Sequence, residues 1–444
     1  MTVTMSMWTR IYNAFDPYRP VPPEKIDAWF VERPASPLLH LLTDLDPGRL
    51  PSRSILVGQL SSGKSTELVK VATELRRRHD YFVVLLDLDE SLDIEKANPV
   101  EVVFLMGAAV YKVATAELRG DPPPVALMNQ LSNGLETIVK TQTANRNFSL
   151  NLAEVLGKVA CYGASLLGGP VGTAVAEVAE RTVGGGKFVS GTDAGVVRKL
   201  EVEPQIERMV ERLNELIADV QARSGRSLVL VVDGLDKIRD PDLIELNFAE
   251  KKFLADPACR VVYSGPIDLY YSPRFAGVRS RFPIRPFPNV KLRTSDAPPR
   301  LVESGYAMLR EVVDRRLASL GLSRAEAIDT PALDALIAAS AGVVRDLVAM
   351  VREATTEADI AGKVAIDVEA AARTILARRR LYAVQLSPKY RAVLDRVKAN
   401  HARTDNPECD ELLRAGLILN YINDLEEWFD VHAILDWTRE GQGV

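Results

Sequence analysis

The sequence has too few cysteines and histidines for a disulfide framework or a zinc site. Its 444 residues include three cysteines, Cys161, Cys259 and Cys409, which lie far apart without a CxxC pair, and only four histidines. This usage is typical of proteins in a reducing compartment, so we expect a cytoplasmic protein. The same scarcity leaves no Cys-His or Ser-His-Asp grouping, which argues against a protease or a similar effector enzyme.

The chain also lacks an excess of positive charge. Lysine and arginine number 55 against 60 aspartates and glutamates, which gives a net charge of −5. The chain as a whole is therefore no polycation, and any contact with nucleic acid needs a local basic patch. Apolar residues make up 47% of the sequence, as in ordinary folded proteins, and its length predicts more than one packed unit.

Long uninterrupted apolar runs are missing as well. The opening MTVTMSMWTRIYNAF lacks the apolar stretch of a secretory signal, and the nearest candidate for a membrane span is residues 152–176. Glu154 and Lys158 interrupt that run, and a Gly-Gly-Pro sequence breaks it again at 168–170. We therefore expect no membrane contact, and we interpret the run as part of an Ala/Gly-rich insert packed on protein.

The most informative segment is SILVGQLSSGKST, residues 54–66. A short apolar strand leads into a Gly-x-x-x-x-Gly-Lys-Ser loop, and an amphipathic helix is predicted over 66–78. Glycines allow the loop amides to point at phosphate oxygens, a lysine neutralises the β- and γ-phosphates, and a serine hydroxyl binds Mg²⁺. We predict that ATP or ADP binds here with Mg²⁺, through Gly58, Ser62, Gly63, Lys64, Ser65 and Thr66.

A second carboxylate element is expected to hold the metal, and SLVLVVDGLD at 227–236 supplies one. Asp233, at the end of its apolar run, is the predicted Mg²⁺ ligand. Asp236 is the candidate for orienting the attacking water, with a cap or turn role as the alternative. Asp87 and Asp89 form a competing pair, which we assign to a neighbouring strand of the sheet.

Four apolar runs, at 54–57, 81–86, 228–232 and 260–263, alternate with amphipathic helices and predict a parallel αβα core of the P-loop NTPase class. The last run ends at Ser264. If its strand lies between the other two, Ser264 faces the γ-phosphate, because ligands bind at the carboxyl ends of parallel strands. A simple strand-ending turn is the alternative.

An arginine-rich segment, YYSPRFAGVRSRFPIRPF, follows that strand. Here the chain resembles the AAA+ superfamily, especially the branch shared by origin-recognition initiators and the signalling STAND NTPases. In that branch an arginine in an SRF context reaches the ATP site of a neighbouring subunit. The resemblance implies that Arg281 is such a finger, with Arg279 as a substitute, and that the protein self-associates. An exposed basic loop is the alternative.

Residues 303–380 are predicted to be almost wholly helical, and SAGVVRDL within them resembles a nucleotide-sensing lid motif. In that motif a glycine starts a helix and an arginine in its first turn contacts the nucleotide; Arg345 matches it. The alternative is a surface arginine paired with Asp346 or Glu353. Upstream, an apolar stripe over 206–220 predicts a helix that packs in the core or forms an oligomer seam.

The C-terminal segment has the outline of a winged helix, two helices and a hairpin, with Ser387 as the first N-cap. Between Arg373 and Arg403, nine basic residues stand against Asp395 alone, a patch that could follow DNA phosphates. The expected recognition helix, PECDELLRAG, and the wing are acidic and would repel a duplex. We therefore favour protein docking or autoinhibition by this domain over DNA binding.

Taken whole, the chain is similar to a set of bacterial AAA-like ATPases. The shared features are the proline-rich YNAFDPYRPVPP, the GKSTEL loop, DGLDKI and VYSGPIDLYYS. The resemblance implies a STAND-like or initiator-like switch; in bacteria such proteins often serve antiphage systems beside a separate effector. Because DGLDK lacks an adjacent acidic pair, we expect slow hydrolysis. The expected domains are an arm (1–40), the ATPase core (41–296, with an insert at 119–200), a helical lid (297–382) and a winged helix (383–444).

Three functions remain open at this point. The leading one is an ATP-dependent switch that regulates a partner effector in bacterial defence or signalling. The alternative is a DNA-binding initiator or loader that uses the basic patch. The third is a scaffold that holds a nucleotide and never turns it over.

Overall fold

The computed structural model describes residues 6–89, 97, 99–144, 203–250, 253–384, 386–423 and 426–435. The chain forms two compact units. One comprises Met1–Pro37, Gly58–Lys70 and Pro286–Val444, and the other comprises Leu38–Val57 and Val71–Arg285. We call them the loop unit and the sheet unit. Most of the expected insert, including its Ala/Gly-rich run, lies outside the described residues.

The sheet has five strands in the order β2-β3-β4-β1-β5. The neighbouring pairs β2–β3, β3–β4 and β4–β1 are parallel. The strands are β1 (Arg53–Val57), β2 (Tyr81–Asp87), β3 (Ser227–Asp233), β4 (Arg260–Gly265) and β5 (Ile284–Pro286). The four predicted apolar runs are all strands, which confirms the parallel αβα class. The sequence did not predict β5, since its FPIRPF context carries prolines that weaken a strand pattern.

The strand order fulfils the condition attached to the Ser264 prediction. β4 lies between β1 and β3, so Ser264 belongs to the strand between the loop strand and the carboxylate strand. β2 is the outer neighbour of β3, with Asp87 in register with Asp233. The sheet therefore has the additional-strand arrangement of P-loop ATPases, and β2 is the neighbouring strand that we expected.

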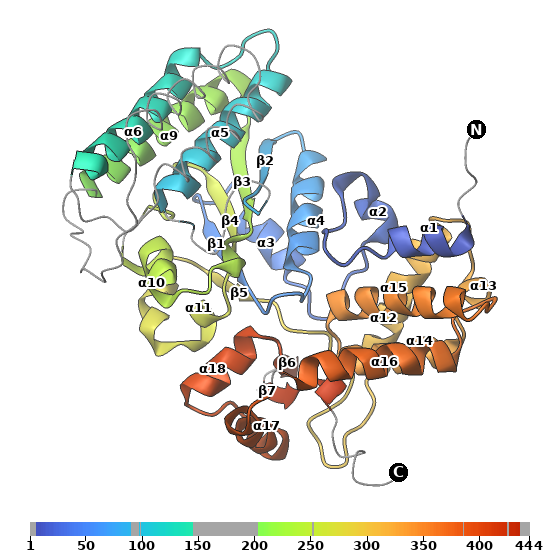
Figure 1. Cartoon of the computed structure of the whole chain (residues 1–444). Helices are drawn as coiled ribbons and strands as arrows, with labels where there is room; N and C mark the ends of the chain where they lie inside the picture. The colour runs from blue at the N-terminus through green and yellow to red at the C-terminus, as the bar shows by residue number, and fades with distance from the viewer. Residues whose placement is uncertain are drawn as a thin grey trace. The chain divides into compact units, whose positions relative to one another are not determined.

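Three long helices cover the sheet unit: α5 (Pro99–Glu117), α6 (Val125–Ala144) and α9 (Glu203–Ser224). Figure 1 shows them side by side. The apolar stripe of α9 is buried against α5 and α6, which confirms its prediction as core. α5 is long and apolar enough to cross a membrane, but 78% of that window is buried inside the protein, as in the core helix of a folded unit.

Shorter elements complete the sheet unit. They are α3 (Leu38–Asp44), the 3-10 helix η3 (Leu235–Lys237), α10 (Pro241–Ile244), the π-helix η4 (Glu245–Glu250), α11 (Asp268–Tyr271) and the 3-10 helix η5 (Pro273–Ser280). Between β3 and β4, where the sequence predicts an amphipathic helix, residues 241–250 form the short α10 followed by the wider turn of η4.

The loop unit contains the helical lid, which is almost wholly helical as predicted. Its helices are α12 (Glu303–Ala318), α13 (Arg324–Ala327), α14 (Thr330–Ser340), α15 (Val344–Ile360) and α16 (Val368–Ala383). Helices α14, α15 and α16 pack on one another, and α1 (Met7–Ala14) of the N-terminal arm packs on α15. The arm also contains η1 (Pro23–Lys25) and α2 (Ile26–Trp29).

The last part of the loop unit, which we call the C-terminal module, has the expected order of two helices and a hairpin. It comprises α17 (Pro388–Asn400), α18 (Pro407–Arg414), β6 (Ile418–Asn423), β7 (Glu426–Val431) and η6 (Ala433–Leu435). β6 and β7 pair antiparallel, and the Tyr421 and Trp428 rings stack with centroids 4.7 Å apart. Ser387 is the N-cap of α17, but its buried hydroxyl makes no capping bond.

Candidate functional site

The phosphate loop joins β1 to α4 (Lys64–Arg76) as the motif requires. Its backbone is left-handed at Ser61 (φ 70°) and Gly63 (φ 105°). A Cβ on Gly58 would lie 2.5 Å from the main-chain oxygen of Phe287, so a larger residue cannot occupy that position without moving the backbone. The glycines thus allow the tight curl that turns amides toward an anion.

Lys64 is buried at the start of α4, with 3% of its surface exposed. Its ammonium donates to the main-chain oxygens of Gly58 (2.8 Å) and Gln59 (2.7 Å). These bonds hold the lysine against the loop that it is predicted to serve. The cation is thereby kept at the N-terminus of a helix, where the backbone dipole also favours an anion.

The remaining predicted loop residues differ in their surroundings. The Ser62 hydroxyl is buried and has no hydrogen-bond partner among the described residues. A buried polar group without a hydrogen-bond partner raises the free energy of the fold, which fits a hydroxyl that binds a ligand. Thr66 already accepts a long bond, 3.5 Å, from the main-chain N–H of Val21 in the arm. Ser65 is partly exposed in the first turn of α4.

Gln59, an unassigned position of the motif, binds the C-terminal module. Its amide nitrogen donates to the main-chain oxygens of Leu413 (2.8 Å) and Ile418 (2.6 Å). Its amide oxygen accepts from the Asn420 main-chain N–H (3.2 Å) and from the Asn289 side chain (2.5 Å). Both donors and both acceptor sites of this 2%-exposed amide are therefore used. No local pattern in the sequence signals this role, because the motif accepts any residue at this position.

Arg345 also reaches the loop. It lies in the first turn of α15 after Gly342, as in the lid motif, and its guanidinium donates to the Ser61 hydroxyl at 3.1 Å. Its main-chain N–H lies 3.4 Å from the Ser61 oxygen. The alternative partners expected for Arg345 are taken, since Asp346 and Glu353 both pair with Arg378.

The residue after Arg345 lies in a buried polar cluster. Asp346 accepts from Arg378 (2.9 Å), from the Tyr382 hydroxyl (3.2 Å) and from Nε2 of His432 (3.0 Å). Nδ1 of His432 accepts from the Ile434 N–H at 3.1 Å, so Nε2 carries the proton. Burial alone would raise the pKa of the Asp346 carboxyl, but the His432 bond and the Arg378 charge leave that pKa lowered. The cluster ties α15 to the end of the hairpin.

The sheet unit holds the predicted carboxylates. Asp233 ends β3 and is 7% exposed, and Asp236 lies in η3. Gly234 between them has φ 105°, and its N–H donates to the buried Ser264 hydroxyl at 2.8 Å. This bond joins the carboxyl end of β4 to that of β3. Ser264 therefore supports the turn from Asp233 to Asp236, which we call the carboxylate turn.

The competing carboxylates at the end of β2 are engaged elsewhere. Asp87 accepts from the Asp89 main-chain N–H at 3.0 Å, and Asp89 pairs with Lys237 at 2.5 Å. A carboxylate already neutralised by lysine is a weaker metal ligand. Among the described residues no group of three histidine, cysteine or acidic side chains forms a preassembled metal site.

The SRF segment anchors its arginine through the neighbouring ring. Phe282 is buried edge-on against Phe248 and Tyr263, with both centroid distances 6.3 Å. Arg281 is exposed, and its guanidinium donates to the Ala249 oxygen at 2.5 Å. Arg279 is also exposed and donates to the Tyr270 oxygen at 2.6 Å. Either arginine could exchange one carbonyl contact for a phosphate from another copy.

Much of the basic patch is neutralised inside the loop unit. Arg373 pairs with Glu369 (2.8 Å), Arg378 with Asp346, and Arg403 with Asp410 (2.8 Å). Arg379 donates to the Ile434 oxygen at 3.1 Å. The exposed basic residues that remain include Arg380 on α16 and Arg391 and Arg396 on α17. The structure therefore offers a smaller patch than the count of charges predicts.

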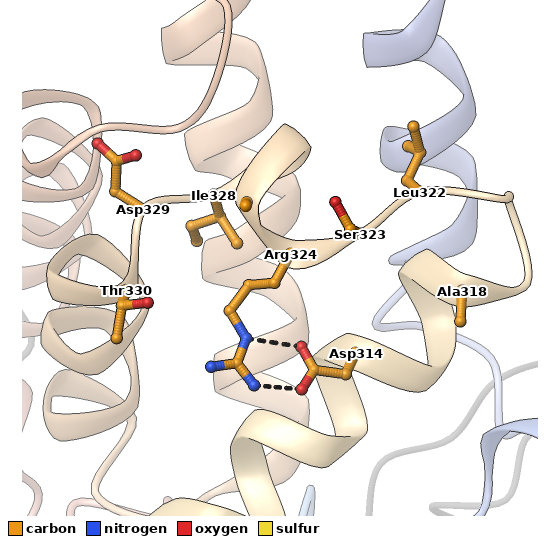
Figure 2. Close-up of a pocket in the computed structure, with 9 residues that line it drawn as sticks. Asp314, Ala318, Leu322, Ser323, Arg324, Ile328, Asp329 and Thr330 are labelled. Carbon is orange, nitrogen blue, oxygen red and sulfur yellow. Dashed lines mark hydrogen bonds and ion pairs between the residues drawn. The ribbon is translucent and has the colours of Figure 1, made fainter.

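A cavity of about 600 Å³ opens in the lid, away from every predicted site residue. Figure 2 shows its main charged pair, Arg324 of α13 pointing at Asp314 of α12. Ser323, Asp329 and Thr330 are the other polar side chains at its wall. Because the arginine is already paired with a carboxylate, the cavity has no free cation for a phosphate.

Neither a family model nor a curated protein matches this chain. Among solved structures, it is similar to Cdc6p from Pyrobaculum aerophilum, at 12% identity and a TM-score of 0.39, over 95% of this chain and 93% of that chain. It is also similar to the Aeropyrum pernix Orc1 protein in complex with DNA, at 14% identity and a TM-score of 0.41, over 93% and 94%. Drosophila ORC bound to DNA matches at 13% identity and a TM-score of 0.38, over 98% and 92%. The fold is identified by the strand order of the sheet and by the phosphate loop between β1 and α4.

Proposed function

We propose that this protein is an ATP-dependent molecular switch of the AAA+ or STAND type. In this proposal the phosphate loop binds ATP or ADP, and the nucleotide controls the C-terminal module. The observation that carries it is the saturated amide of Gln59, which links the loop directly to β6 and α18. A nucleotide that changes the shape of the loop would strain these bonds. The C-terminal module would then be held on the loop in one nucleotide state and released in another.

The residues present fit a magnesium nucleotide. Gly63, with φ 105°, allows the loop to curl, and the buried Ser62 hydroxyl lacks a partner among the described residues. Lys64 would neutralise the β- and γ-phosphates, while Ser65 and Asp233 would hold Mg²⁺. The ion, when bound, offsets phosphate charge. Asp236 would orient water, and Ser264 would hold the turn that carries the carboxylates. Hydrolysis would be slow, because DGLDK lacks an adjacent acidic pair.

Self-association completes the proposal. Arg281 would enter the nucleotide site of a second copy, and its planar guanidinium suits phosphate oxygens. The buried Phe282 supports this role, because it fixes the chain next to an exposed guanidinium. The output would go to a separate effector protein, in a bacterial defence or signalling system. A nucleotide-locked scaffold differs only in never releasing phosphate.

DNA binding is the second candidate, in an initiator or loader. The observation in its favour is α17, where Arg391 and Arg396 are exposed beside Asp395. Phosphate contacts of this kind weaken steeply with salt. A duplex that binds at low ionic strength and is released as salt rises would support the initiator. A duplex that does not bind at any salt concentration would remove it.

Hydrogen exchange of the full chain tests the switch. Amides of β6 and of the first turn of α15 are compared without nucleotide, with Mg-ADP and with a Mg-ATP analogue. The switch predicts that protection at Asn420 and Arg345 differs between nucleotide states. Lys64→Ala should abolish that difference. Identical exchange in all three states, with saturating nucleotide bound, would contradict the switch.

A further inference from the structure

A buried arginine from the N-terminal arm is hydrogen-bonded to the main chain of the phosphate loop. Arg33 is 7% exposed, and its guanidinium donates to the main-chain oxygens of Ser62 (2.6 Å) and Pro288 (2.8 Å). The guanidinium carbon lies 3.9 Å from the centroid of the Phe287 ring, within the range of a cation–π contact. Arg33 thus joins the loop to the chain segment that follows β5.

The hydrogen bond from Arg33 to the Ser62 oxygen also orients the peptide between Ser62 and Gly63. A trans peptide is planar, and its C=O and N–H point in opposite directions. Because the Ser62 oxygen points at Arg33, the N–H of Gly63 in the same peptide points to the other side of the loop. In a phosphate loop that is the side on which amides meet phosphate oxygens.

The glycines of the motif fit the same arrangement. Gly63 has φ 105°, and a Cβ there would lie 3.2 Å from the Arg33 guanidinium. A Cβ on Gly58 would meet the main-chain oxygen of Phe287 at 2.5 Å. Both glycines therefore let Arg33 and the Phe287–Pro288 segment approach the loop closely.

The guanidinium is held at an electrostatic cost. Burial lowers the pKa of Arg33 to about 10, and the nearby charge of Glu67 partly opposes that shift. Burial in turn raises the pKa of the Glu67 carboxyl, which accepts a short bond from Ser36. At neutral pH Arg33 stays charged, so it can hold the Ser62 oxygen with a charge-assisted bond.

We propose that Arg33 is a positioning residue for the phosphate loop: it holds the Ser62–Gly63 peptide so that the Gly63 N–H is set to receive a phosphate. This inference rests on the proposed function, since it concerns the same nucleotide. It assigns to the N-terminal arm a role in binding phosphates, and Arg33 itself touches no ligand.

The test compares Arg33→Lys with Arg316→Lys in the full-length protein. Arg316 is the matched control because it is also buried, with its pKa lowered to about 10, donates to the Ala14 oxygen (2.8 Å) and stacks on Trp29. It makes no contact with the phosphate loop among the described residues. Lysine keeps the charge in both variants but cannot bridge two carbonyls with a planar fork.

Affinities for Mg-ATP, Mg-ADP and inorganic tripolyphosphate are measured by calorimetry, together with the melting temperature. Loss of a charge-assisted bond predicts about a tenfold weaker binding of all three ligands by Arg33→Lys. Arg316→Lys should melt earlier to a similar extent and bind as the wild type does. Phe287→Leu, which removes the buried ring beside the Arg33 guanidinium, should weaken binding in the same direction and by less.

Four results would overturn the inference, three of them from the arginine variants. One is wild-type affinity in Arg33→Lys; another is an equal loss in both arginine variants, which would indicate general destabilisation. The third is a loss for ATP without a loss for tripolyphosphate, which would place Arg33 at the base or sugar. If the wild type bound no nucleotide, the proposed function itself would be rejected. If the wild type binds nucleotide and Phe287→Leu binds it equally well, only the inference about Arg33 would be rejected.

Discussion

The main-chain N–H of Asn420 donates to the side-chain oxygen of Gln59 at 3.2 Å, so a strand of the C-terminal module is bonded to the phosphate loop. The two residues are 361 positions apart in the sequence. Both are buried, with 2% and 3% of their surfaces exposed. In a buried setting an unmade hydrogen bond is costly, so this contact contributes to holding β6 on the phosphate loop.

Replacing Gln59 with alanine should therefore release the module. The change leaves the Leu413 and Ile418 oxygens and the Asn420 N–H without their partner, at about 1–3 kcal/mol for each group that stays dry. We expect faster hydrogen exchange at Asn420 and a lower melting temperature. Gln221→Ala is the control, since its amide accepts a single bond, from Leu228 at 3.0 Å in the sheet unit. Unchanged protection at Asn420 would contradict the link.

The Asp346 cluster predicts a stability that depends on pH. Asp346→Asn removes a buried carboxylate from Arg378 and His432, which should cost about 3–5 kcal/mol at pH 7. Because the folded pKa of Asp346 lies below its ordinary 3.8, the stabilisation is complete above that value and is lost as pH falls through the folded pKa. Denaturant unfolding between pH 7 and pH 3 measures the difference between the variant and the wild type.

That difference should shrink only at the acid end of the range. Glu369→Gln is the control, because its carboxylate forms an exposed pair with Arg373 on the same helix and should change stability by less than about 0.5 kcal/mol. A gap that stayed constant down to pH 3 would mean that Asp346 is not the titrating group.

Asp236→Asn separates binding from turnover. If this carboxylate orients water, the variant should bind Mg-ATP as the wild type does and release phosphate about a hundredfold more slowly. Asp233→Asn, by contrast, should weaken the magnesium dependence of binding. Phosphate release under single-turnover conditions distinguishes the two. Wild-type turnover in Asp236→Asn would reassign the residue to the turn that follows β3.

Arg281→Ala tests assembly. The finger role predicts that the wild type self-associates with an ATP analogue and that its turnover per chain rises with protein concentration. Removing the guanidinium should cut turnover by about a thousandfold and abolish the concentration dependence. Arg279→Ala decides between the two arginines, because the same loss of turnover in that variant would make Arg279 the finger. Light scattering that shows a monomer with and without the analogue would exclude a finger in trans.

The sequence predicted those parts of the protein that depend on local pattern. The apolar runs identified four strands, and the loop motif located the turn before α4. The sequence left open whether the strand of Ser264 lies between the other two, and the structure places β4 between β1 and β3. Each of these inferences uses neighbours in the chain or a rule of sheet geometry.

What the sequence could not predict depends on contacts between distant segments. Gln59 occupies a position where the motif allows any residue, and Arg33 lies 29 positions from Ser62, whose carbonyl oxygen it binds, so neither carries a local signal. Charge counting failed for a related reason: Arg378 and Arg403 belong to ion pairs with Asp346 and Asp410, which only packing brings together. Spacing alone cannot show which charges face solvent.

Lys64 and its loop are proposed to bind the phosphates of ATP, and an equilibrium titration with Mg-ATP decides whether they do. The wild type should bind Mg-ATP in a saturable manner, and Lys64→Ala should bind at least about tenfold more weakly. Lys70→Ala, on the same helix, with its ammonium 3.4 Å from Asp27, should bind as the wild type does. Equal binding of Mg-ATP by the wild type and Lys64→Ala would contradict the account.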